Sequence, residues 1–188
     1  MESFPIFNPP DTIRENLGGI SHEEAYLFAA GYGHDLGYVT PEVRKLQEDS
    51  GYPGMKVLQF AFDSREAGDY FPYAYTENSV CYSGTHDNLT LAQWLKEALP
   101  QDVERAKAYL GLHEQEGYVR GMIRGCMSTV SKLCVIQLQD HLELGGQARM
   151  NFPGTLSPDN WTWRALPGML TRELAQQIRE MTLRYGRI

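Results

Sequence analysis

The sequence of 188 residues lacks the features that mark several large classes of protein. It has only three cysteines, Cys81, Cys126 and Cys134, and none stands in a C-x-x-C spacing. We therefore expect buried thiols in a reducing compartment, not a disulfide framework or a zinc site. No apolar run approaches the roughly 18 residues that a membrane span requires. Glu2 stands where a secretory signal would carry positive charge, so we expect a cytoplasmic chain.

Positive charge is also scarce. Lys and Arg number 17 against 24 Asp and Glu, and the net charge of −7 argues against nucleic acid or a membrane as a partner. Hydrophobic residues make up 42% and charged residues 22%, which is typical of a folded globular chain. The length corresponds to about one domain, and it is well short of the roughly 250 residues of a complete (β/α)₈ barrel.

The pattern of apolar residues predicts an α/β fold with a parallel sheet. Three short, nearly continuously apolar runs predict buried strands, at 55–62 (MKVLQFAF), 79–83 (SVCYS) and 133–138 (LCVIQL). Helical spacing and start signals predict helices at 41–50, from Asn88 as N-cap to Pro100, near 101–110, near 116–131, and after Thr171. Three strands make a thin sheet for a chain of this length, which suggests part of a larger sheet.

Polar residues follow the predicted strands, where parallel α/β barrels place their working residues. His86 and Asp87, in the turn GTHDN after the second strand, have no structural task once Asn88 caps a helix. Gln59 and Phe60 belong to the first strand and precede a tyrosine-rich loop, and aromatic faces beside polar groups suit sugar rings. The alternatives are ordinary turn chemistry for the first pair and core packing for the aromatic residues.

A third group of polar and aromatic side chains follows the last strand. Arg149, Asn151 and Trp161 lie in one glycine-rich loop and would form a polar and aromatic surface. The alternative is a solvated loop that carries two aromatic residues by chance.

Several long motifs resemble the C-terminal part of the amylomaltases, which are 4-α-glucanotransferases of the α-amylase-like superfamily. The matching stretches keep the order of that family: DLGYVTPEV (35–43), GYPGMKVLQFAF (51–62), GTHDN (84–88), LQDHLELGGQARMNFPGT (138–155), NWTWR (160–164) and LRYGR (183–187). The resemblance implies that residues 34–188 are the C-terminal part of a (β/α)₈ catalytic domain, an incomplete half-barrel. Residues 1–33 have no such match and are expected to form an arm with a short helix capped by Ser21.

The resemblance also implies an activity and a set of site residues. The family transfers an α-1,4-glucan segment to the 4-hydroxyl of another sugar by a retaining double displacement, without a metal or organic cofactor. Asp87 matches the carboxylate that stabilises the transition state. Five positions match residues that contact the α-glucan: His86, Asp35, Gln59, Phe60 and Asn151.

Two further positions depart from the family pattern. The family's acid/base is a Glu directly before Asp-Leu-Gly, and this chain has His34 there. Histidine can also serve as a general acid or base near neutral pH. The nucleophilic Asp of the family lies in a motif like R-x-D-H, which does not occur in these residues. Two of the three expected carboxylates are therefore missing, and the loss of either should lower the rate by orders of magnitude.

The sequence leaves three interpretations open. The first is the C-terminal part of a 4-α-glucanotransferase that works with a complementing N-terminal half, as a split or truncated gene would give. The second is an inactive remnant that at most binds maltooligosaccharides. The third is an unrelated α/β protein with a fortuitous His-Asp turn, which the motif series disfavours. An open half-barrel would also expose sheet edges and apolar faces, so we expect self-association.

Overall fold

The structure, a computed structural model, describes residues 41–65 and 70–187. The chain divides into two compact units, Met1–Met55 and Lys56–Ile188. The expected arm at 1–33 and the candidate residues His34 and Asp35 lie outside the described residues. In the first unit, the helix α3 (Pro41–Ser50) confirms the prediction for this stretch. It ends at Ser50, and the following Gly51 has a φ of +68°, which suits a residue without a side chain.

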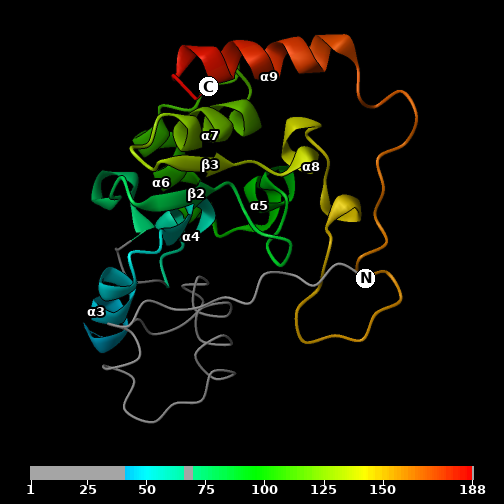
Figure 1. The fold of residues 1–188 in the computed structure, drawn as a ribbon. Helices are drawn as coiled ribbons and strands as arrows, with labels where there is room; N and C mark the ends of the chain where they lie inside the picture. Colours follow the sequence, from blue (N-terminus) through cyan, green and yellow to red (C-terminus); the bar gives the residue numbers. More distant parts are fainter. Residues whose placement is uncertain (1–40, 66–69, 188) are drawn as a thin grey trace, which may run out of the picture. The chain divides into compact units, whose positions relative to one another are not determined.

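A three-stranded sheet with the order β1-β2-β3 positions the site. Its strands are β1 (Gly54–Val57), β2 (Ser79–Tyr82) and β3 (Leu133–Val135). β2 and β3 run parallel, with Cys81 facing Cys134, as the predicted fold class requires. The helical elements that follow β1 are α4 (Leu58–Phe62), η2 (Pro72–Ala74), α5 (Leu91–Glu97), α6 (Pro100–Leu110), α7 (Tyr118–Met127), α8 (Leu138–His141), η3 (Gly146–Ala148) and α9 (Arg172–Arg184). Figure 1 shows α7 between β3 and α9.

The first apolar run does not form one strand. β1 ends at Val57, and the rest of the run, LQFAF, turns into the short helix α4. A helical turn places Leu58, Ala61 and Phe62 on one face, and all three are buried in the core. The prediction of a strand to Phe62 is therefore wrong, because a short apolar run satisfies a buried strand and a buried helix equally well.

The third run also differs from its prediction. β3 ends at Val135, and its side chains Leu133 and Val135 are 55% and 39% exposed. β3 is the last strand in the sheet order and, among the described residues, pairs with β2. The expectation of a buried strand over 133–138 is therefore wrong, because β3 lies at an edge of this sheet.

The helix predictions within the described residues are confirmed, except that α7 ends at Met127 and that one cap differs. Thr171 caps α9 by accepting a hydrogen bond from the Leu174 amide (3.1 Å), and Gly186 follows with a φ of +64°. α5, however, begins at Leu91 with Thr90 as its N-cap, so the assignment of this role to Asn88 is wrong. Thr90 has the same capping chemistry, since its hydroxyl accepts from the Gln93 amide (3.2 Å).

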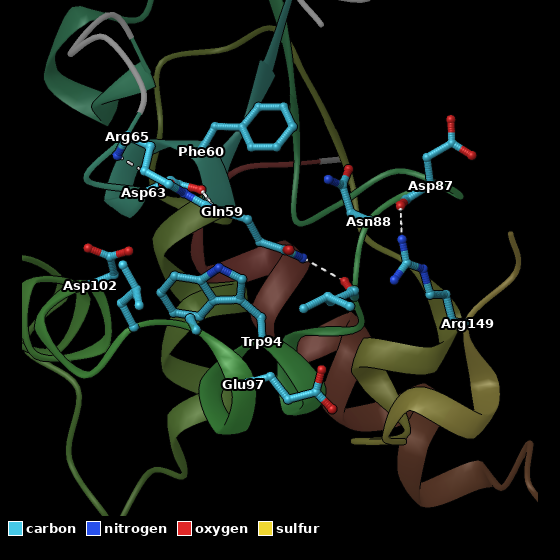
Figure 2. Close-up of a pocket in the computed structure, with 13 residues that line it drawn as sticks. Gln59, Phe60, Asp63, Arg65, Asp87, Asn88, Trp94, Glu97, Asp102 and Arg149 are labelled. Carbon is cyan, nitrogen blue, oxygen red and sulfur yellow. Dashed lines mark hydrogen bonds and ion pairs between the residues drawn. The ribbon is translucent and has the colours of Figure 1, made fainter. Parts of the chain in front are cut away.

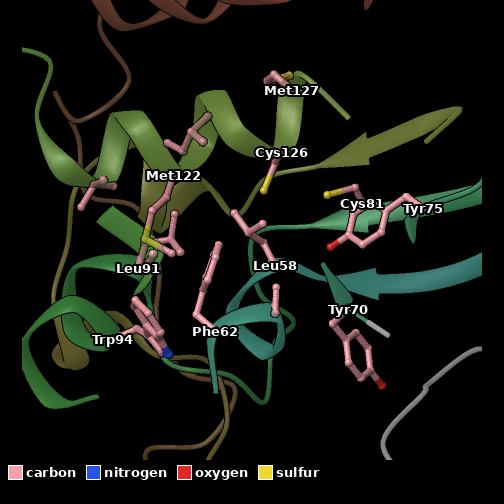
Figure 3. Close-up of a cluster of buried hydrophobic side chains, with 14 residues drawn as sticks. Leu58, Phe62, Tyr70, Tyr75, Cys81, Leu91, Trp94, Met122, Cys126 and Met127 are labelled. Carbon is pink, nitrogen blue, oxygen red and sulfur yellow. The ribbon is translucent and has the colours of Figure 1, made fainter. Parts of the chain in front are cut away.

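One core joins α4, α5, α7 and β2 (Figure 3). Its largest buried members include Leu58, Phe62, Leu91, Met122 and Ile123. The thiols of Cys81 and Cys126 are buried in this core, and Cys134 is half-buried. Burial raises the pKa of the Cys126 thiol, which keeps it protonated and unreactive. In residues 41–65 and 70–187, no group of three or more His, Cys, Asp and Glu side chains could hold a metal ion. Over the same residues, no helix has the length and apolar character that a membrane crossing requires.

Candidate active site

The loop after β2 is built by the motif GTHDN itself. The Asn88 side-chain oxygen accepts from the amide and the hydroxyl of Thr85, both at 2.8 Å, and the Asn88 amide donates to the Thr85 carbonyl (3.1 Å). Asn88 therefore closes the loop instead of capping α5. His86 and Asp87 lie at the tip of this closed turn, between the two residues that form it.

Two glutamine amides hold this loop from the neighbouring strand ends. Gln59 Nε2 donates to the Leu89 carbonyl (2.7 Å), and Gln137 Nε2 donates to the Thr85 carbonyl (2.9 Å). Gly84 lies between them, and a Cβ there would come within 2.6 Å of one amide nitrogen and 2.8 Å of the other. A side chain at position 84 would therefore displace the ends of the two glutamine side chains that hold the loop. Sequence reasoning missed Gln137, because the third strand was expected to continue through it.

The carboxylate of Asp87 is held by side chains from two loops. Its Oδ1 accepts from Asn151 Nδ2 (2.6 Å), and its Oδ2 lies 3.3 Å from His86 Nε2. The main chain is joined as well, since the Asn151 amide donates to the His86 carbonyl (3.1 Å) and Arg149 Nη2 to the Asp87 carbonyl (2.6 Å). The structure therefore brings together three of the predicted site residues, although Asn151 is 64 residues from Asp87 in sequence.

The segment 149–161 carries the groups that border this carboxylate. Arg149 Nε donates to the Asn151 carbonyl (2.9 Å), and its guanidinium carbon lies 4.8 Å from the centre of the Phe152 ring. The Trp161 amide donates to the Met150 carbonyl (2.7 Å), which closes residues 150–161 into a compact loop. Burial lowers the pKa of Arg149 below its usual value, and arginine remains charged at neutral pH.

A cavity of about 350 Å³ lies beside the Asp87 loop. It combines aromatic and acidic side chains, and its lining includes Gln59, Phe60, Asp63, Asp87, Trp94, Glu97, Asp102 and Arg149. In Figure 2, the Asp87 carboxylate points away from Trp94 and Glu97, while its main-chain carbonyl meets Arg149. The predicted residues Gln59, Phe60 and Asp87 thus line one cavity, and the carboxylate of Asp87 turns toward Asn151.

The buried carboxylate of Asp140, to which sequence reasoning gave no role, holds together the two elements that flank the site. Asp140 on α8 accepts from the Ser83 hydroxyl (2.6 Å) and from the Leu91 amide (2.7 Å). It thereby ties the end of β2 to the first turn of α5, on either side of the Asp87 loop. Burial raises the pKa of Asp140 above its usual value. The sequence signal that could have indicated this role is the position of Asp140 shortly after a predicted strand.

The fold and the site together define a parallel α/β protein with a polar, aromatic site at the carboxyl ends of its strands. The family model described as 4-alpha-glucanotransferase, glycoside hydrolase 77, matches residues 20–170. The chain belongs to this family.

Individual relatives agree with the family match. The chain is 44% identical to a Clostridium butyricum 4-alpha-glucanotransferase over 183 residues, which are 97% of this chain and 35% of that protein. It is 42% identical to one from Thermus thermophilus over 154 residues, or 78% of this chain and 31% of that protein. The solved amylomaltase from Streptococcus agalactiae in complex with acarbose matches with a TM-score of 0.77 and 30% identity, over 81% of this chain and 31% of that one.

The extent of these matches bears on the domain prediction. The chain spans about a third of the length of the relatives that it matches. It aligns with the C-terminal part of amylomaltases, as the motifs indicated. The family match begins at residue 20, inside the segment 1–33 for which the motifs gave no counterpart. The boundary at residue 33 and the half-barrel stay predictions.

Proposed function

We propose that this chain supplies the C-terminal part of a 4-α-glucanotransferase site, which transfers an α-1,4-glucan segment to the 4-hydroxyl of another sugar. The observation that carries this proposal is the carboxylate of Asp87, which Asn151 and His86 hold at the end of a parallel strand. Family membership and the relatives' names support the reaction class. The S. agalactiae amylomaltase was solved with acarbose, which supports a sugar ligand.

In this proposal, Asp87 stabilises the transition state. A retaining transfer passes through an oxocarbenium-like transition state, in which positive charge develops on the sugar. A carboxylate at about 4 Å interacts with a unit positive charge by about 4 kcal/mol at an effective dielectric constant of about 20. The hydrogen bond from Asn151 fixes one carboxylate oxygen in advance, so little reorganisation is needed when the charge develops. His86 and Asn151 would bind sugar hydroxyls beside it.

We propose that the nucleophilic carboxylate comes from a complementing N-terminal half and that His34 takes the acid/base role. A retaining mechanism needs a nucleophile and an acid/base about 5–5.5 Å apart. The family's R-x-D-H motif is not among these 188 residues, and His34 stands at the acid/base position. The exposed edge strand β3, with Leu133 and Val135, supports pairing with a further strand. The same edge supports self-association of the chain alone, for which light scattering would detect species larger than a monomer.

The test is disproportionation of maltotriose, measured as glucose released and longer maltooligosaccharides formed. The chain is assayed alone and after mixing with the N-terminal two thirds of the C. butyricum relative. We expect turnover in the mixture, lost with Asp87→Asn and retained with Asp159→Asn, an exposed acid of the same loop region. Turnover by the chain alone would contradict the need for a complementing half, and loss of turnover with His34→Ala would support His34 as the acid/base.

A second candidate function is glucan binding without turnover. The cavity of about 350 Å³, lined by Phe60, Trp94 and three acidic side chains besides Asp87, favours it. Calorimetric titration of the chain alone with maltoheptaose would then give saturable binding and no products. Absence of both binding and complementation would overturn the glucanotransferase proposal.

A further inference from the structure

We propose that Trp161 is a sugar-stacking residue, whose exposed indole face receives the pyranose ring next to the sugar held by Asp87. This inference rests on the proposed function and adds a binding contact to the same site. Neither the motif resemblance nor the comparisons assign a role to this side chain. Two independent features of the structure carry it, the backbone conformation of Trp161 and the position of its ring.

The backbone of Trp161 adopts an uncommon conformation. Its φ is +65°, in the left-handed region that favours glycine and asparagine and that a bulky side chain rarely occupies. The surroundings enforce it, because the Trp161 amide donates to the Met150 carbonyl and the neighbouring Asn160 is fixed at both ends. The Asn160 side chain accepts from the Phe152 amide (3.0 Å) and donates to the Thr155 carbonyl (3.1 Å). Enforced conformations of this kind concentrate at functional sites.

The ring of Trp161 lies where a ligand for Asp87 would pass. Its centroid is 4.8 Å from that of His86, which in turn contacts the Asp87 carboxylate. Trp161 is nevertheless 52% exposed, whereas the core tryptophan Trp94 is 7% exposed. An indole that served only packing would be covered. Here the imidazole contacts one part of the ring, and much of the rest faces solvent.

The neighbouring groups complete a surface that suits a pyranose. A sugar ring presents C–H bonds on its faces and hydroxyls at its rim, so it binds best where an aromatic plane lies beside hydrogen-bonding groups. Trp161 supplies the plane. Asp87 supplies an acceptor and Asn151 an amide, and His86 contacts both the Trp161 ring and the Asp87 carboxylate. The predicted ligand is a maltooligosaccharide that spans both.

The test compares the affinity for maltoheptaose of three Trp161 variants, measured by calorimetry at a temperature where each is folded by circular dichroism. Trp161→Asn removes the ring but keeps a residue that tolerates a positive φ, so its melting temperature should equal or exceed that of the parent chain. We expect Trp161→Asn and Trp161→Ala to bind about tenfold more weakly, which corresponds to about 1.4 kcal/mol. Trp161→Phe should keep the affinity within about threefold.

Tryptophan fluorescence separates direct contact from an indirect effect. Binding should change the emission of the parent chain, and this change should be reduced in Trp161→Phe but kept in full in the matched control Trp163→Phe. Parental affinity in both Trp161→Asn and Trp161→Ala would overturn the inference and leave the proposed function intact. Failure of the parent chain to bind maltoheptaose, alone and with the complementing half, would instead overturn the proposed function.

Discussion

Replacement of Asp140 offers the most direct test of how the site is supported. This side chain is fully buried, and its two oxygens accept from the Ser83 hydroxyl (2.6 Å) and the Leu91 amide (2.7 Å). Both donors belong to fully buried residues, so water cannot replace the lost acceptor. Asp140→Ala therefore leaves two buried donors without partners.

The expected loss follows from those two donors. Each unsatisfied buried donor costs about 1–3 kcal/mol, and removal of a buried carboxylate offsets part of the sum. We expect Asp140→Ala to lower the free energy of unfolding by about 2–4 kcal/mol, a large share of the roughly 5–15 kcal/mol of an ordinary domain. Asp140→Asn keeps an acceptor for Leu91 and should lose about 1 kcal/mol.

Urea unfolding followed by circular dichroism measures this loss, with the exposed Asp159→Ala as the control. A value for Asp140→Ala within 1 kcal/mol of the parent chain, at an unchanged slope, would refute the reasoning. The pH dependence of the free energy of unfolding gives a second test of the burial of Asp140. Burial raises the pKa of Asp140 above 3.8, so the folded chain keeps a proton that the unfolded chain has released. The parent should therefore lose stability relative to Asp140→Asn as the pH rises from 3.8 through the folded pKa, with no further change above it.

Three other substitutions test separate parts of the structure. Gly84→Ala should cost about 1–3 kcal/mol in urea unfolding and weaken maltoheptaose binding, because its methyl group would displace both glutamine amides; wild-type values would contradict the close approach. The hydrogen bond to Arg124 lowers the pKa of Glu116, so this group stabilises the fold above pH 4.5 and the benefit is lost as the pH falls through the lowered pKa. Glu116→Gln should remove that slope, by about 1 kcal/mol or less because the pair is only partly buried. Arg187→Met removes donors to three carbonyls at the end of α7 and in the turn after it. We expect the free energy of unfolding in urea to fall by more than about 1 kcal/mol, and a smaller loss would show that these hydrogen bonds are dispensable.

Local signals in the sequence predicted the parts of the fold that local interactions determine. Thr171 and Gly186 mark both ends of α9, since capping depends on residues within one turn. The run MKVLQFAF is different, because its apolar residues would be buried equally well in a strand or in a helix. Its division at Val57 depends on the core around Phe62, which the sequence does not display.

The candidate site divides in the same way. His86 and Asp87 were predicted because they stand in a turn after a strand and match a motif. Gln137 and Asp140 could not be given their roles, because each acts through a partner about 50 residues away in sequence. Contacts at such distances depend on the register of the strands, and the sequence pattern placed the end of β3 too late.

The motif GTHDN joins a structural and a chemical task in five residues. Gly84, Thr85 and Asn88 form the loop, by close approach and by side-chain hydrogen bonds, so changes at these positions should affect folding and binding together. The side chains of His86 and Asp87 form none of the hydrogen bonds that close the loop, to which Asp87 contributes only its amide, bonded to the Thr85 hydroxyl (3.3 Å). Changes there should reduce binding or transfer while the free energy of unfolding stays close to that of the parent. A motif match alone cannot separate these two groups, and the hydrogen bonds of Asn88 are what separate them.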